Sequence, residues 1–168
     1  LTGVGMRRLI AILLPLCAMP TWSDARHPVA ESVLVDKSMR KMWLVAAGRK
    51  YREYDISLGD RPEGHKKQEG DERTPEGRYV IDYRNPESKY HLSLHIDYPR
   101  QQDLEAARQS GVSPGGNIFI HGVPNGLESA SGKLAGRDWT DGCIAVSNQE
   151  IEEIWQLVRD GTPIEILK

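Results

Sequence analysis

The chain has 168 residues, which suits one domain at roughly 100–200 residues per domain. Lysine and arginine number 22 against 24 acidic residues, a formal net charge of −2 that argues against a polyanion binder, so we expect no nucleic-acid partner. With 39% hydrophobic and 27% charged residues the chain is not disordered, and its two cysteines, Cys17 and Cys143, exclude a framework of several disulfides.

The amino terminus has the layout of a secretory signal peptide. Two arginines follow Met6, an apolar run occupies residues 9–18, and small residues precede a cleavage position after Ala25. We therefore predict a signal peptide over residues 1–25 with its start at Met6, and one domain over residues 26–168 that is exported to the periplasm or cell envelope. The run is too short to span a membrane, and we expect no transmembrane segment in the mature chain. An uncleaved anchor, a core helix and lipidation at Cys17 are the alternatives.

Runs of β-forming residues bounded by turn residues predict the strands. These runs lie at residues 32–36, 41–45, 51–57, 78–83, 90–96, 117–121 and 163–167. Strict alternation in the fifth run predicts that Leu92, Leu94 and Ile96 share one face. Residues 60–76 form a long polar segment, and its charged part at 63–73 is interpreted as a solvated loop, with a substrate-gating lid as the alternative.

Two segments predict helices. One spans residues 103–110 and ends at Gly111. The other begins at the capping box Ser147–Glu150, carries an apolar stripe that includes Ile151 and Ile154, and ends at Gly161. The predicted fold class is mostly β, a compact sandwich or barrel-like sheet with two or so helices. We expect the side chains of Trp43 and Trp155 to belong to the core.

The chemistry concentrates at His121, which ends a strand, and at Cys143, which follows a glycine. A thiolate is a nucleophile, and a nearby imidazole can take its proton and hold the two groups as an ion pair. A cysteine that is also unpaired in an exported chain is either an intermolecular partner or a reactive group. The alternative interpretation is a buried structural cysteine and an unrelated histidine. A zinc set with His91 and His95 is disfavoured, because four residues of strand separate them by about 13 Å, so we expect no metal and no cofactor.

The order and spacing of these residues resemble a known family. His121-Gly122, 17 further residues and then Thr140-Asp141-Gly142-Cys143 are similar to the motif of the L,D-transpeptidase catalytic domain, the YkuD type. The segments 74–79, 96–99 and 115–122 are also similar to segments of that family. The resemblance implies a mostly β domain, a substrate in the stem peptides of peptidoglycan, and a part in cell-wall biogenesis and cell shape.

The resemblance also implies a mechanism. The thiolate attacks the amide carbonyl after the third stem residue, a thioester forms, and the terminal D-alanine leaves. An amine from another stem peptide, a protein acceptor or water then resolves the thioester. Carried over by position, Cys143 is the nucleophile and His121 the general base. The implied supporting residues are Thr140 and Gly122 as site-shaping residues, the amides of Gly142 and Cys143 as oxyanion donors, and Trp139, Asp138 and Arg137 as possible pocket residues.

One position departs from the family pattern. Ala145 stands where the family often has an arginine two residues after the cysteine. A guanidinium there would suit bidentate contact with a carboxylate, and Arg137 or Arg73 are candidates to replace its charge. Hydrolysis by an L,D-carboxypeptidase or endopeptidase therefore stays open beside transfer. A non-catalytic domain that binds the cell wall is the alternative of another class.

Overall fold

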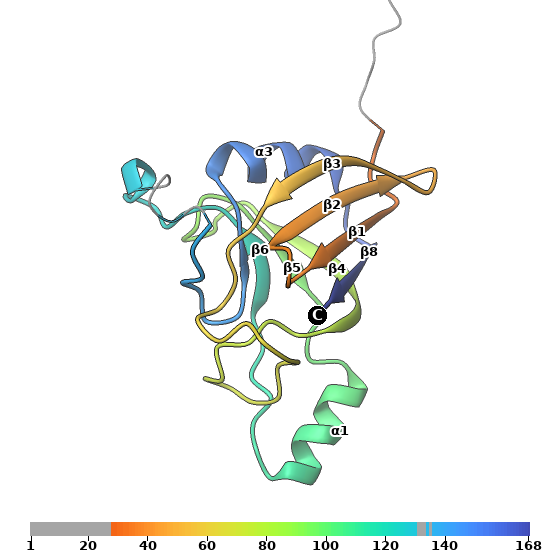
Figure 1. Cartoon of the computed structure of the whole chain (residues 1–168), viewed down its shortest axis with the longest axis vertical. Helices are drawn as coiled ribbons and strands as arrows, with labels where there is room; N and C mark the ends of the chain where they lie inside the picture. Colours follow the sequence, from red (N-terminus) through yellow and green to blue (C-terminus); the bar gives the residue numbers. More distant parts are fainter. Residues whose placement is uncertain (1–27, 131–133, 135) are drawn as a thin grey trace, which may run out of the picture.

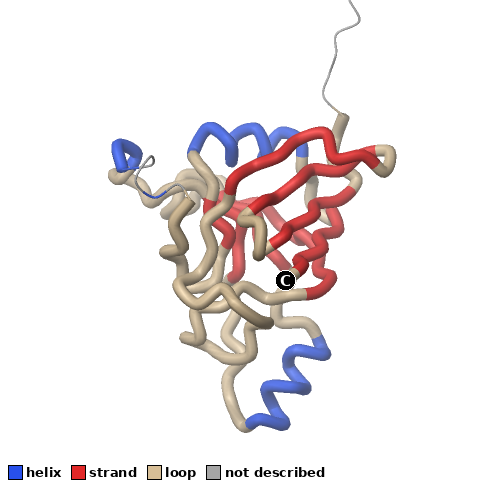
Figure 2. Tube along the Cα trace, in the orientation of Figure 1, coloured by secondary structure: helices blue, strands red, loops and turns tan. Residues whose placement is uncertain are grey.

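A single curled sheet dominates the computed structural model of this protein, which describes residues 28–130, 134 and 136–168. The predicted signal peptide, with Cys17, lies outside the described residues. Across the sheet the strand order is β3-β2-β1-β8-β4-β5-β6-β7 (Figures 1 and 2). The strands are β1 (Ser32–Asp36), β2 (Lys41–Ala46), β3 (Arg49–Asp55), β4 (Gly77–Asn85), β5 (Ser93–Ile96), β6 (Ile118–His121), β7 (Ile144–Ala145) and β8 (Thr162–Leu167). The helices are α1 (Gln101–Ser110), α3 (Asn148–Leu157) and a short 3-10 helix at Glu128–Ala130.

The predicted class, mostly β with two helices, is confirmed. The first three strands form an antiparallel meander, and β8 joins this meander to the rest of the sheet. On one side β8 runs parallel to β1, with Val35 opposite Ile166, and on the other it runs antiparallel to β4, with Tyr79 opposite Ile164. The last strand of the chain therefore connects the N-terminal meander to strands β4–β7.

The core lies between the curled sheet and α3. Alternate residues of the strands face inward, so that side chains such as Leu44, Ile81 and Ile120 are fully buried. Helix α3 adds Ile151 and Ile154 to the same cluster. Figure 1 shows α3 lying along one end of the sheet.

The capping box that predicted the start of α3 is confirmed. The Ser147 hydroxyl accepts from the Glu150 N–H, and the Glu150 carboxylate accepts from the Ser147 N–H at 2.8 Å. The predicted end at Gly161 is wrong, because the helix ends at Leu157. Val158 has an extended backbone (φ −108°, ψ 130°), which stops the helix, and Gly161 instead occupies the turn that enters β8.

The strand predicted over residues 90–96 is shorter than expected. Only Ser93–Ile96 pair as β5, while His91 has a φ of +66° and the N–H of Gly122 donates to the carbonyls of Tyr90 and Leu92. Leu94 and Ile96 are buried on one face, as the alternation predicted. The turn at residues 90–92 brings the Tyr90 ring beside the predicted site, which a continuous strand would not do.

Helix α1 starts two residues earlier than predicted. Asp103 occupies its third position, where its carboxylate accepts from the Arg100 N–H at 2.9 Å. Asp103 is buried and also accepts from the Tyr79 hydroxyl at 3.3 Å. The predicted end is confirmed, since Gly111 caps the helix in the left-handed conformation (φ 67°).

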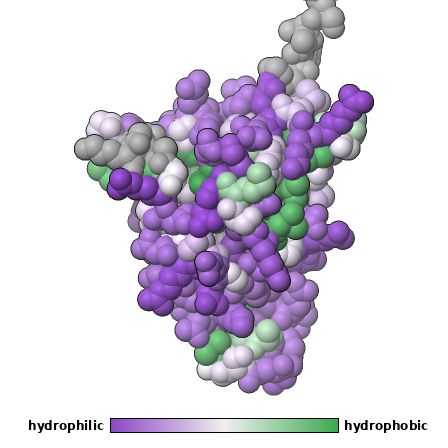
Figure 3. All heavy atoms as spheres, in the orientation of Figure 1, coloured by the Kyte–Doolittle hydropathy of each residue, from purple (hydrophilic) through white to green (hydrophobic). Residues whose placement is uncertain are grey.

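Hydrophilic side chains cover most of the face shown in Figure 3. Trp43 is buried and Trp155 packs against the core while partly buried, in agreement with the prediction for both. None of the helices in the described ranges has the length and apolar character needed to cross a membrane.

Candidate active site

Two neighbouring strands bring His121 and Cys143 to the same part of the sheet. β6 and β7 are parallel, with Ile120 opposite Ile144 and His121 opposite Ala145. Cys143 immediately precedes β7, and its Sγ accepts from the N–H of Phe119, in β6, at 3.4 Å. His121 and Cys143 are 22 positions apart in the sequence. The residues between them form a long connection, and the pairing of β6 with β7 brings the two ends of that connection together.

The His121 ring is enclosed and oriented. The residue is only 4% exposed, and the rings of Tyr90 and Trp139 lie 4.4 Å and 5.7 Å from it between centroids. Its Nδ1 lies 2.6 Å from the Gly122 carbonyl oxygen. A carbonyl only accepts, so Nδ1 carries the proton and Nε2 of the neutral ring is the free base. The backbone of Gly122 is therefore the third member of the arrangement.

Burial decides the charge state of this histidine. It lowers the pKa of His121 to about 4, and the hydrogen bond to Gly122 opposes that shift only in part. Burial likewise raises the pKa of the Cys143 thiol to about 11, although the N–H of Phe119 favours the thiolate. At neutral pH the two groups are thus a neutral thiol and a neutral imidazole. Burial thus disfavours the ion pair described from the sequence, and the pair itself stays a prediction.

Thr140 holds the turn that presents the cysteine. Its buried hydroxyl donates to the Cys143 carbonyl at 2.8 Å and accepts from the Gly142 N–H at 3.2 Å. This is the site-shaping position that the motif implied for Thr140. The N–H of Gly142 is already engaged, so the structure leaves the amide of Cys143 as the better candidate of the two predicted oxyanion donors.

Both glycines of the motif are required by close backbone approach. Gly142 has a φ of +120°, and a Cβ there would lie 2.5 Å from the carbonyl oxygen of Arg73. A Cβ on Gly122 would lie 2.5 Å from the Asn148 Oδ1 and 3.0 Å from the Tyr90 carbonyl oxygen. A side chain on Gly142 would displace the loop backbone at Arg73, whereas one on Gly122 would displace the Asn148 side chain and press on the Tyr90 carbonyl.

The loop at residues 60–76 packs against the cysteine turn. Through its carbonyl, Arg73 lies against Gly142, and the charge of Lys66 lowers the pKa of Cys143 slightly. Lys66 is itself buried and bonds to Asp71 at 2.9 Å. The prediction that residues 63–73 are solvated is correct for most of them but wrong for Lys66, which is buried.

The three residues predicted as possible pocket residues, Arg137, Asp138 and Trp139, have different surroundings. Asp138 accepts from the Leu58 N–H and from the Arg40 guanidinium, which lies 2.6 Å away, so its carboxylate ties two segments together. Arg137 is exposed. Trp139 is the one of the three whose side chain lies against His121.

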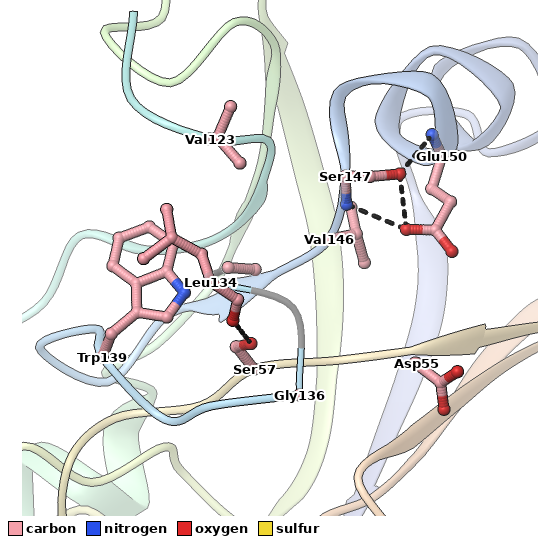
Figure 4. Close-up of a pocket in the computed structure, with 10 residues that line it drawn as sticks. Asp55, Ser57, Val123, Leu134, Gly136, Trp139, Val146, Ser147 and Glu150 are labelled. Atoms are coloured by element: carbon pink, nitrogen blue, oxygen red, sulfur yellow. Dashed lines mark hydrogen bonds between the residues drawn. The ribbon is translucent and has the colours of Figure 1, made fainter. Parts of the chain in front are cut away.

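A pocket of about 330 Å³ lies beside Trp139 and Ala145 (Figure 4). Its wall also carries the carboxylates of Asp55 and Glu150, the latter held by the Ser147 cap. Ala145, which lines this pocket, contributes only a methyl group at the position where the family often has an arginine. Sequence reasoning did not find this pocket, because its lining comes from segments far apart in the chain.

His91 and His95, the two histidines of the disfavoured zinc set, have acidic partners. His91 Nε2 lies 2.7 Å from Glu152, and His95 Nδ1 lies 2.6 Å from Asp82. Within the described ranges of the chain, no group of three or more His, Cys, Asp or Glu side chains is placed to hold a metal ion.

Comparison with known proteins identifies the family. The L,D-transpeptidase catalytic domain (YkuD) matches residues 30–166. This chain belongs to that family. The crystal structure of Pgp2, a helical cell shape determining protein from Campylobacter jejuni, is 30% identical with a TM-score of 0.60, covering 80% of this chain and 46% of that one.

Two further proteins with L,D-transpeptidase descriptions are similar to this chain. YafK of Escherichia coli, described as a candidate L,D-transpeptidase, is 31% identical over 97 residues, which are 56% of this chain and 32% of YafK. An L,D-transpeptidase structure from Xylanimonas cellulosilytica shares the fold, with 16% identity and a TM-score of 0.54 over 84% of this chain and 62% of that one. The chain thus spans about a third of YafK and under half of Pgp2.

Proposed function

We propose that this protein is an exported L,D-transpeptidase that acts on the stem peptides of peptidoglycan, with Cys143 as its nucleophile. The observation that carries the proposal is the fixed geometry of His121, whose Nδ1–H is bonded to Gly122 so that Nε2 is left to accept a proton, on the strand that pairs with β7 directly after Cys143. Family membership supports the substrate class.

The first chemical step follows from the neutral state of both groups. The Cys143 S–H proton passes to Nε2 of His121 as Sγ attacks the carbonyl carbon after the third stem residue. The Cys143 amide donates to the developing oxyanion. His121 then gives its proton to the nitrogen of the departing D-alanine, and a thioester remains on Cys143.

The second step determines whether the enzyme transfers or hydrolyses. An amine attacks the thioester in transfer, and water attacks it in hydrolysis, with His121 again accepting the proton. One observation favours hydrolysis as the second candidate: a pocket lies beside Ala145, the position at which the family often has an arginine. The same cysteine and histidine serve both reactions.

A single assay separates these outcomes. The protein is incubated with tetrapeptide muropeptide, with and without an amine acceptor, and the products are identified by mass spectrometry. D-alanine release with a new crosslink indicates transferase activity, and release with tripeptide alone indicates hydrolysis. Cys143→Ala should abolish both, whereas Met39→Ala, at an exposed position of the β1–β2 turn, is the control and should retain them. A wild-type protein that binds sacculi but forms no product would favour the wall-binding alternative and refute the proposal.

The neutral pair also predicts the pH dependence of turnover. Since His121 must be unprotonated to act as the base and its pKa is about 4, kcat/KM should rise through pH 4 and stay level across neutral pH. An acid limb near pH 6.5 would mean that the histidine is solvated in the active enzyme. A steady rise from pH 7 towards 11 would mean that only the pre-formed thiolate reacts.

A further inference from the structure

A row of aromatic side chains crosses three strands and ends at the cysteine. Tyr83 in β4 pairs directly with His95 in β5, and His95 pairs with Phe119 in β6. The Tyr83 and His95 rings are stacked with centroids 4.5 Å apart, and the His95 and Phe119 rings meet edge to face at 4.9 Å. The N–H of Phe119 in turn donates to Cys143 Sγ. The row therefore forms one continuous surface next to the nucleophile.

The outer ring of this row is available to a ligand. Tyr83 is 44% exposed, although its ring rests on His95, whereas Tyr54 and Tyr79 are buried in the core. The other tyrosine with comparable exposure, Tyr90, covers His121. Exposed tyrosine rings thus border the candidate site on two sides, and this distribution does not serve the core.

A carboxylate stands beside the exposed ring. Asp82 Oδ1 bonds to His95 Nδ1 at 2.6 Å, which fixes the histidine under Tyr83, and the Asp82 side chain is 42% exposed. A flat aromatic face accepts the C–H groups of a pyranose ring, and a carboxylate accepts its hydroxyl hydrogens. An anionic ligand would be repelled by Asp82, which disfavours a phosphate or nucleic-acid ligand.

The length of the row matches the length of the stem peptide. Three strand spacings of about 4.8 Å separate Tyr83 from Cys143 Sγ, about 14 Å in all. Three extended residues span at most about 10–11 Å, and the lactyl ether that joins the peptide to the sugar ring covers the remaining distance of roughly 3 Å. A stem peptide with its third carbonyl at Cys143 would therefore run over Phe119 and His95 and place the attached sugar at Tyr83.

We propose that Tyr83, supported by His95 and flanked by Asp82, is a sugar-binding subsite that holds the glycan end of the substrate while its stem peptide reaches Cys143. The proposal rests on the proposed function for the identity of the peptide. It adds that the enzyme recognises the glycan as well as the peptide.

The test compares two substrates that differ only in the sugar: a free tetrapeptide and the same tetrapeptide on the disaccharide N-acetylglucosamine–N-acetylmuramic acid. For the wild type we expect a KM for the disaccharide substrate that is lower by about three- to tenfold, the range that one aromatic contact provides. Tyr83→Ala should remove this difference and Tyr83→Phe should keep it. Met39→Ala changes an exposed side chain at the β1–β2 turn and is the control, with both KM values unchanged.

A binding measurement separates this inference from the proposed function. The disaccharide without peptide is titrated into the wild type, and the NMR signals of Tyr83 and Phe119 should shift. If neither substrate is processed, the proposed function fails while this titration still tests the subsite. Equal wild-type KM values for the two substrates, or no shift with the disaccharide, would overturn the subsite and leave the proposed function intact. An equal rise of both KM values in Tyr83→Ala would place the peptide on the ring and overturn it as well.

Discussion

Mild acid should destabilise this protein through one buried side chain. His121 is neutral in the folded state with a pKa of about 4, whereas a histidine in the unfolded chain titrates near its ordinary value of 6.5. Between these two values the unfolded chain binds a proton that the folded protein excludes. The stability that His121 confers is complete above pH 6.5 and is lost as the pH falls towards 4. At about 1.4 kcal/mol per pH unit, the loss is about 2.5 kcal/mol by pH 4.5 and about 3 kcal/mol in full.

Urea unfolding of the wild type and of His121→Gln at several pH values measures this effect. Glutamine can still donate to the Gly122 carbonyl but does not titrate, so the carboxylates contribute equally to both curves. The difference in free energy of unfolding between wild type and variant should fall by about 2.5 kcal/mol from pH 7 to pH 4.5. If the free energies of unfolding of the two proteins change with pH in parallel, the reasoning is refuted. An NMR titration that gives His121 a pKa near 6.5 would refute it as well.

Three substitutions test how the site is supported. Gly142→Ala should lower the free energy of unfolding by more than about 3 kcal/mol, because the new Cβ would meet a loop carbonyl at 2.5 Å. The control is Gly126→Ala, at a similarly positive φ but in open space, which should lower it by only about 1 kcal/mol. Thermal unfolding of the two variants compares these losses. Asp71→Asn should cost about 3–5 kcal/mol and loosen the 60–76 loop, since it leaves the buried Lys66 ammonium uncompensated, and proteolysis within the loop would report this. Ser147→Ala should cost about 1 kcal/mol in urea unfolding through loss of the α3 cap, and an unchanged midpoint would contradict it.

The elements that local chemistry specifies could be predicted from the sequence. The capping box at Ser147 and the left-handed glycine at Gly111 each fix a helix end within a few residues, so both were identified correctly. Strand β7 has only Ile144 and Ala145, and it exists because β6 lies beside it, which no local pattern encodes. The turn at residues 90–92 was not predicted for a related reason. Its alternating sequence pattern favours a strand, but hydrogen bonds from the distant Gly122 N–H hold these residues as a turn.

The features of the candidate site also fall into those that a local motif predicts and those that depend on tertiary packing. The His-Gly and Thr-x-Gly-Cys spacing pointed to His121 and Cys143, because the motif constrains the backbone as well as the reacting atoms. The enclosing Tyr90 ring and the buried Lys66 were missed, since their positions depend on how distant segments pack. Burial disfavours the expected ion pair for the same reason: the groups packed around His121 and Cys143 shift their pKa values, and this packing belongs to the tertiary structure.

A neutral thiol and a neutral imidazole have a consequence for the reactivity of Cys143. Because burial raises the pKa of the Cys143 thiol and lowers the pKa of the His121 imidazole, it opposes formation of the ion pair in the free protein. The thiolate is the form that oxidants and electrophiles attack, so the free protein is protected from them. Under the proposed function, the proton transfer accompanies the attack on the bound carbonyl, where the amide N–H of Cys143 donates to the developing oxyanion. Reactivity is in this way tied to occupancy of the site, and iodoacetamide should label Cys143 slowly at pH 7 and faster as the pH approaches 11.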